Sequence, residues 1–163
     1  MTWRTEVRPD DVAAVRDIVE STGFFHAHEV AVACELVEER LSKGEASGYH
    51  FLFAHDSLQP APLGYACFGP IACTEGSFDL YWIAVHQRSR GAGMGRLIAR
   101  RAEEIAAAMG ARRMYAETSG RELYAPTRAF YERCGYVAEA RLEDFYAPGD
   151  AKVIYARSLA RAL

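Results

Sequence analysis

Hydrophobic and polar residues follow two different periods along the chain, and these periods divide it into strands and helices. Short runs rich in apolar residues, typical of strands, cover 3–8, 49–54, 63–68, 77–85, 113–118, 136–142 and 151–157. Elsewhere apolar residues recur every three or four positions, which indicates amphipathic helices between Pro9 and Gly23, over 30–43, over 94–109 and from near Pro126 to Gly135. Glycine or proline stands at most of these boundaries, as is usual where helices start and stop.

The order of these elements predicts the fold class. It is β-α-α-β-β-β-α-β-α-β-β, in which hairpins are mixed with strand-helix-strand units. Hairpins pair strands antiparallel, whereas a crossover helix joins parallel strands. We therefore predict an α/β fold with a central mixed sheet and helices on both of its faces. The chain has 163 residues and no repeat or linker, so we expect a single domain over 1–163.

Composition narrows the possible partners. The net charge of −3 gives the chain as a whole no nucleic-acid-binding signature, and no apolar run is long enough to span a membrane. The N-terminus lacks the apolar core of a signal peptide, so we expect a cytoplasmic protein. We expect no metal site, because His26 and His28 lack a partner pair at ligand spacing. The four cysteines have no Cys-x-x-Cys spacing, and we interpret them as reduced: Cys34, Cys67, Cys73 and Cys134.

The strand at 77–85 leads into a glycine-rich loop that opens a helix. The loop contains Arg90, Gly91, Ala92, Gly93, Met94, Gly95 and Arg96. Backbone N–H groups in the first turn of a helix have no internal partner, and the helix dipole adds positive charge there. Glycines let such a backbone close around an anion, so this segment predicts a phosphate cradle. A P-loop would need Gly-Lys-Ser/Thr, and a Rossmann fingerprint would need glycine where Arg96 stands. The alternative is that the glycines only turn the chain.

This loop, Arg-x-x-Gly-x-Gly after a strand, resembles the acyl-CoA pyrophosphate loop of the GNAT superfamily of N-acetyltransferases. A second segment carries the same resemblance: Phe130-Tyr131 followed by Gly135-Tyr136 is similar to the signature of the family's fourth helix. The order of elements resembles the GNAT fold along nearly the full chain. Where the family often has Asn and Ala ahead of the aromatic-Tyr pair, this chain has Tyr124 and Thr127, so the resemblance does not carry over the usual Asn contact to the pantetheine arm.

The resemblance assigns residues to the acyl donor. It implies that the loop residues Arg90–Arg96 bind the pyrophosphate of acetyl-CoA. It also implies that backbone groups of Ile83, Ala84 and Val85, opened by a local bulge, bind the pantetheine arm much like an added strand. Tyr131 takes the place of the general acid that protonates the departing CoA thiolate, a task that suits a phenol with an ordinary pKa of about 10. The alternative is that Tyr131 packs on its helix with the hydroxyl in water.

The resemblance also points to a base and to an acceptor site. Asp79 aligns with a carboxylate base of some family members, and its apolar neighbours could raise its pKa and let it deprotonate the acceptor through a water. Glu117 is the rival base, and an aspartate in a strand-edge turn is the structural alternative. Loops that face the acceptor in the family here contain Phe24, Phe25 and Tyr146, which with Glu117 we expect to line that site. These aromatics could equally be plugs over a small core.

Together these residues predict an N-acetyltransferase. It would transfer an acetyl group from acetyl-CoA to a primary amine by direct attack in a ternary complex, without a metal. The acceptor would be a small-molecule amine or a protein amine, and a homodimer is possible. One alternative is a non-catalytic acyl-CoA-binding or interaction module on the same fold, and another is a protein-modifying acetyltransferase.

Overall fold

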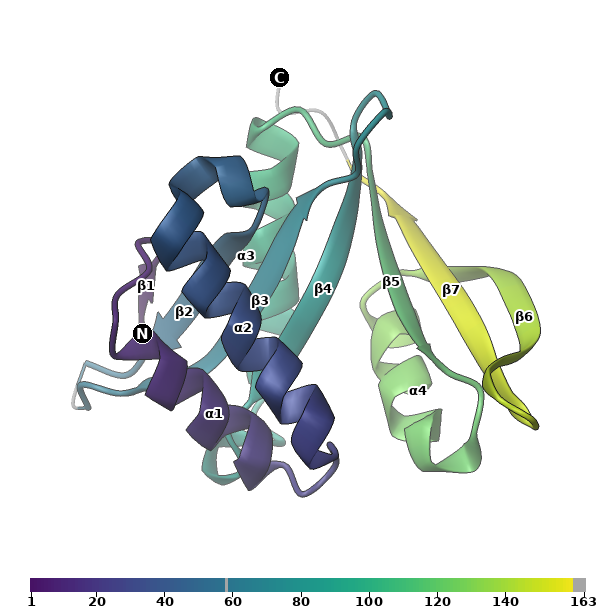
Figure 1. Ribbon diagram of the computed structural model, residues 1–163, viewed down its shortest axis with the longest axis horizontal. Helices are drawn as coiled ribbons and strands as arrows, with labels where there is room; N and C mark the ends of the chain where they lie inside the picture. The colour runs from purple at the N-terminus through teal and green to yellow at the C-terminus, as the bar shows by residue number, and fades with distance from the viewer. Residues whose placement is uncertain (58, 160–163) are drawn as a thin grey trace. The chain divides into compact units, whose positions relative to one another are not determined.

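The computed structural model describes residues 1–57 and 59–159 (Figure 1). Its strands and α-helices confirm the predicted order and the mixed α/β class: β1 (Thr2–Arg4), α1 (Asp11–Ser21), α2 (Ala27–Lys43), β2 (His50–His55), β3 (Pro62–Pro70), β4 (Ser77–Val85), α3 (Met94–Ala108), β5 (Arg113–Ser119), α4 (Ala125–Arg133), β6 (Val137–Ala147) and β7 (Asp150–Ser158). Short 3₁₀ helices follow α2 (η1, Gly44–Ser47), precede α3 (η2, Gln87–Ser89) and precede α4 (η3, Glu122–Tyr124).

Within the described residues the strands form a seven-stranded sheet in the order β1-β2-β3-β4-β5-β7-β6. β4 pairs with β5 in parallel, whereas β1 with β2, β2 with β3, β5 with β7 and β6 with β7 pair antiparallel. The chain divides into two compact units, one made of Met1–Gly69 and Trp82–Ala102, the other of Pro70–Tyr81 and the chain from Glu103 onward. The single domain over 1–163 stays a prediction, and residues 58 and 160–163 of that range lie outside the described part.

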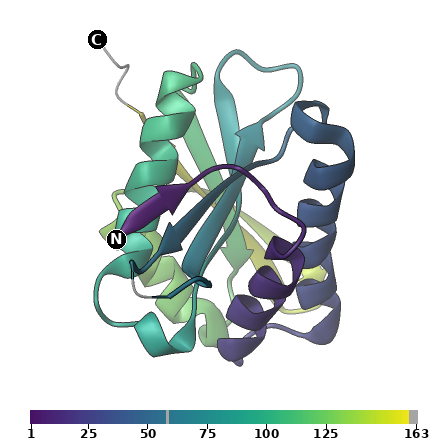
Figure 2. The same ribbon diagram turned by 90° about the vertical axis from the view of Figure 1, so that its left-hand side faces the viewer.

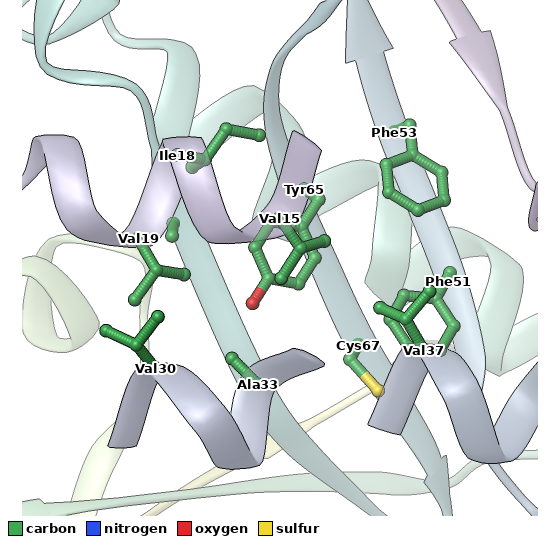
Figure 3. Packing of buried hydrophobic residues seen from close by; sticks show 11 residues of the cluster. Val15, Ile18, Val19, Val30, Ala33, Val37, Phe51, Phe53, Tyr65 and Cys67 are labelled. Carbon is green, nitrogen blue, oxygen red and sulfur yellow. The ribbon is translucent and has the colours of Figure 1, made fainter. Parts of the chain in front are cut away.

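The first unit has its core between two helices and the sheet. Apolar residues at helical spacing on α1 and α2 face alternate residues of β2 and β3, as Figure 3 shows. The fully buried members include Val15, Val19, Val37, Phe53 and Tyr65. Burying such side chains supplies about 1.5–3 kcal/mol each, which fixes these helices on this face.

The other face of the first unit is covered by the start of α3 (Figure 2). Contact there is so close that a Cβ atom at Gly64 would lie 2.8 Å from Ile98 Cδ1 and 3.2 Å from Val85 Cα. Position 64 therefore tolerates only glycine without displacement of its neighbours. The end of β4 is held against β3 at the same place, because His86 N–H donates to the Leu63 carbonyl at 2.8 Å.

In the second unit, one sheet face carries helices and the other carries charges. The ring of Tyr131 on α4 lies 5.6 Å from that of Tyr155, and Arg157 pairs with Glu103 of α3 at 2.8 Å. Tyr155 and Arg157 alternate along β7 with Lys152 and Ile154. Because successive side chains of a strand point to opposite faces, Lys152 lies on the face away from α4.

The end of β1 and the start of α2 differ from the prediction because of side-chain contacts. β1 ends at Arg4, since Arg4 forms an ion pair with Asp11 at 2.7 Å and Arg8 N–H donates to the same carboxylate at 2.7 Å. These bonds turn the chain into α1. α2 starts at Ala27 because Glu29 accepts a hydrogen bond from His26 N–H at 2.8 Å.

The prediction that Tyr146 lies in a loop is wrong. Tyr146 and its neighbour Phe145 belong to β6, which runs to Ala147 and pairs there with Asp150. The ladder is irregular between Leu142 and Ala147, where Asp144 has a φ of +54°. The Asp144 carboxylate accepts a hydrogen bond from Gly149 N–H at 2.7 Å, which replaces the long loop by a tight turn.

Candidate active site

The predicted phosphate loop joins β4 to α3, and its backbone adopts positive φ angles that glycine tolerates. Gly91 and Gly93 have φ values of +83° and +76°, and a Cβ atom built on either would meet nothing within 4 Å. Gly93 also ends the loop, because its carbonyl accepts the first α-helical bond of α3, from Leu97 N–H at 3.2 Å. The space beside Gly91 and Gly93, just before the first turn of α3, is therefore open, as an anion site requires.

Side chains from other elements hold the start of this loop. The Gln87 N–H donates to Ser21 Oγ at the end of α1 at 3.1 Å, and Arg88 N–H donates to His86 Nδ1 at 3.2 Å. His86 Nε2 lies 3.5 Å from Asp17 Oδ2. The sequence alone did not indicate that His86 and Ser21 hold this loop. A polar residue just before a turn was the signal for His86, whereas Ser21 acts across 66 positions and left no local signal.

The aromatic residues predicted on the first loop pack on one another. The rings of Phe24 and Phe25 lie 5.5 Å apart, and Phe25 lies 5.0 Å from Trp82 of β4. Phe25 and Trp82 are half-buried against the core of the first unit. Phe25 thus carries a packing role, and Trp82 is an aromatic neighbour that the sequence analysis did not single out.

Tyr131 lies in an aromatic cluster of the second unit. Its side chain is 6% exposed, and its ring lies 5.6 Å from the rings of Tyr136 and Tyr155. Burial, and to a lesser extent Cys134 and Tyr146, raises the pKa of Tyr131. The phenol therefore stays protonated throughout the neutral range, as a general acid must.

Asp79 and Glu117 share the face of the second unit that carries no α4. Asp79 is half-buried on β4 and stands opposite Tyr115 of β5, two residues before Glu117. Burial raises the pKa of Asp79, the charge of Glu117 raises it further, and Lys152 lowers it. The Glu117 carboxylate is paired with Lys152 at 2.5 Å. The predicted base and its rival are therefore neighbours.

Tyr146 contributes an exposed aromatic surface near the same carboxylates. Its side chain is 48% exposed, and its ring lies 5.1 Å from that of Phe145. Burial of the hydroxyl, together with Glu117 and Asp150, raises the pKa of Tyr146 to about 12. Tyr146 and Glu117 therefore come together, as expected of two residues of one site.

The sequence model of the acetyltransferase (GNAT) family matches residues 12–136. The chain belongs to the GNAT family of acetyltransferases. The crystal structure of a protein from Desulfovibrio desulfuricans, assigned to the GNAT family of acetyltransferases, is 48% identical, with a TM-score of 0.94 over 98% of this chain and 99% of that one. None of the curated proteins compared with the chain matches it significantly.

More distant GNAT structures share the fold. An aminoglycoside 6'-N-acetyltransferase complexed with coenzyme A is 17% identical, with a TM-score of 0.77 over 100% of this chain and 99% of that one. The ribosomal-protein-S18-alanine N-acetyltransferase of Escherichia coli is 16% identical, with a TM-score of 0.73 over 99% of this chain and 96% of that one. At these identities the likeness shows the fold alone.

This GNAT chain differs from the family's Asn and Ala pattern at the start of α4, close to Arg128. Tyr124 ends η3, and Thr127 lies in the first turn of α4. Arg128 donates to the carbonyl groups of Ser119 at 2.8 Å and Arg121 at 2.7 Å. This guanidinium holds the longer connection from β5 to α4 in place.

The predicted residues of this GNAT chain fall into the two units. The glycine loop, Ile83–Val85, Phe24 and Phe25 belong to the first, whereas Tyr131, Asp79, Glu117 and Tyr146 belong to the second. Within the second unit Tyr131 and Asp79 lie on opposite faces of the sheet. Tyr131 contacts Tyr155, which pairs with Ala116, whereas Asp79 pairs with the adjacent residue Tyr115.

Other features of the described residues take no part in these sites. An open hollow of about 380 Å³, lined in part by Arg128, Arg141 and Tyr155, contains none of the predicted residues. No group of three His, Cys, Asp or Glu residues suited to a metal ion occurs in the described ranges. Nor does any helix in them have the length and apolar character needed to cross a membrane.

Proposed function

We propose that this GNAT chain transfers the acetyl group of acetyl-CoA to a primary amine, by direct attack of the amine on the thioester in a ternary complex. The glycine loop carries the proposal. Two left-handed glycines, open space around them and the start of α3 suit the pyrophosphate of the donor. Arg90 in the loop and Arg96 in the first turn of α3 add positive charge beside it.

Next along the donor is the pantetheine arm, which we assign to backbone groups of Ile83, Ala84 and Val85. The close contact of Gly64 with this stretch supports the assignment, because it fixes the position of the β4 backbone. The Val85 amide would polarise the thioester carbonyl and stabilise negative charge on its oxygen during attack.

Tyr131 would then donate a proton to the departing CoA thiolate. The position of Tyr131 in the Phe130-Tyr131 signature of α4 supports this role, and its phenol carries the proton to be donated at neutral pH. The neighbouring rings of Tyr136 and Tyr155 hold Tyr131 in one orientation.

Asp79 would accept the proton of the acceptor ammonium through a water molecule. A carboxylate whose pKa is raised toward neutrality is a better base than an exposed one. Glu117 is the alternative base, and Glu117, Tyr146, Phe24 and Phe25 would contact the acceptor.

Acetyl-CoA turnover across a panel of amines tests this function. We expect release of CoA thiol, detected with a thiol reagent, and an acetylated amine of matching mass for at least one amino acid, polyamine, aminoglycoside or peptide. Tight CoA binding without thiol release across the panel would indicate the non-catalytic module instead. Acetylation confined to peptides would indicate the protein-modifying enzyme. A homodimer and a cytoplasmic location stay predictions of the sequence.

A further inference from the structure

Three charged side chains lie in a row on one face of the second unit. Asp79 of β4 stands opposite Tyr115 of β5, and Glu117 follows on the same face two residues later. Glu117 stands opposite Ile154 of β7, and Lys152 precedes Ile154 by two residues. Asp79, Glu117 and Lys152 are thus diagonal neighbours across three adjacent strands, a spacing that long side chains can bridge.

Lys152 is not a mobile surface lysine. Its side chain is 14% exposed, and its ammonium lies 2.5 Å from Glu117 Oε2. The same ammonium lies 4.2 Å from the centre of the Phe145 ring, which covers it from β6. The irregular segment of β6 around Asp144 brings Phe145 to this place. A cation held between a carboxylate and an aromatic face keeps one position.

We propose that Lys152 is a positioning residue of the acceptor site, which fixes Glu117 and offsets its charge so that Asp79 stays ionised as the proton acceptor. This inference rests on the proposed function, because it assigns to Asp79 the role of base. It adds to that function a residue without contact to the reacting atoms, and it explains why two neighbouring carboxylates can coexist on one face.

The electrostatic environment of Asp79 supports the inference. Two carboxylates on adjacent strands raise each other's pKa, and a cation beside them has the opposite effect. Burial and Glu117 raise the pKa of Asp79, whereas Lys152 lowers it. The other charged groups of this face have partners of their own: Arg113 pairs with Glu139, and Asp150 accepts a hydrogen bond from Ser119 Oγ at 2.5 Å. Lys152 therefore offsets the negative charge of Glu117.

Lys152→Met tests the proposal, with Lys152→Arg as the matched control. Methionine keeps an apolar stem under Phe145 and removes the charge, whereas arginine keeps the charge. Two quantities are measured: the pH dependence of kcat/KM, and the titration of the Asp79 side-chain carboxyl by carbon NMR, which needs no turnover. We expect Lys152→Met to move the acidic limb of the profile and the Asp79 titration to higher pH. Lys152→Arg should return both toward the wild-type values.

If Lys152→Met does not fold, Glu117→Gln tests the proposal instead. Glu117→Gln removes the opposing charge, so the Asp79 titration should move to lower pH. An Asp79 titration that is unchanged in folded Lys152→Met, or in Glu117→Gln, would overturn the inference. The NMR titration also separates it from the proposed function: absence of acetyl transfer with every amine would refute the function, while the titration still decides whether Lys152 controls Asp79.

Discussion

The backbone of Gly64 approaches that of Ala84 so closely that a Cβ atom at position 64 would lie 2.8 Å from the Ala84 carbonyl oxygen. Ala84 belongs to the stretch assigned to the pantetheine arm. The fit of β3 against β4 therefore bears on donor binding as well as on stability.

Gly64→Ala should affect both properties. We expect a loss of about 1–3 kcal/mol in the free energy of unfolding, as for other overpacked sites, because a backbone oxygen and Ile98 must move. CoA affinity measured by calorimetry should fall as well, since Val85 is displaced. Gly120→Ala is the control: its new methyl group would lie 2.8 Å from the flexible end of Arg141 and 3.2 Å from Ala151 Cβ, with no backbone oxygen in its way, so we expect a smaller loss. Equal stability of the two variants would refute the close-contact explanation.

Gly93→Glu should weaken CoA binding in a protein that still folds. A carboxylate at this position would stand where the pyrophosphate is proposed to bind, so we expect affinity to fall at least about tenfold, or ~1.4 kcal/mol. Gly48→Glu is a matched control: Gly48 has a φ of +75°, close to the +76° of Gly93, with open space around it as well. Both variants should lose similar stability in urea, and only Gly93→Glu should lose CoA in calorimetry. Equal CoA affinity in the two would exclude the loop from donor binding.

Tyr131→Phe should lower kcat by about 10²–10⁴, the usual effect of removing a positioned acid. The ring contacts with Tyr136 and Tyr155 remain, so stability and CoA affinity should change little. Tyr155→Phe is the control, because it removes a hydroxyl from the same cluster, one that donates to Glu132 at 3.2 Å. Full kcat in Tyr131→Phe, measured where chemistry limits the rate, would remove this residue from the mechanism.

Phe25→Ala and Tyr146→Ala should separate packing from acceptor binding. Phe25 packs on Trp82 and on the core, so its loss should lower the free energy of unfolding by about 3 kcal/mol. Tyr146 is nearly half exposed, so its loss should raise the KM of the acceptor with little change in stability. Urea unfolding and steady-state kinetics measure the two effects. A stability loss in Tyr146→Ala as large as that in Phe25→Ala would make Tyr146 a core residue.

The sequence predicted the elements whose signal is local. The apolar run at Ser77–Val85 gives β4 with both ends correct, and the periodic stripe from Met94 gives α3. The glycine loop was predictable because glycine tolerates the positive φ that the loop has at Gly91 and Gly93.

The contacts that could not be predicted from the sequence depend on the pairing of strands or on a single side chain. The pairing of Lys152 with Glu117 exists only because β7 runs antiparallel to β5 with Glu117 opposite Ile154. The length of β6 was missed because a single side chain, Asp144, closes a turn that composition alone describes as a loop. Neither contact leaves a trace in hydrophobic periodicity.

The hydrogen bond from Gln87 to Ser21 joins two segments with different tasks. Ser21 ends α1 three residues before Phe24, and Gln87 begins η2 three residues before Arg90. The glycine loop and the Phe24–Phe25 segment are therefore connected through the Gln87–Ser21 hydrogen bond. Because coupling between two sites is reciprocal, a donor that orders the glycine loop would favour order in the Phe24–Phe25 segment, and an acceptor on that segment would favour donor binding equally.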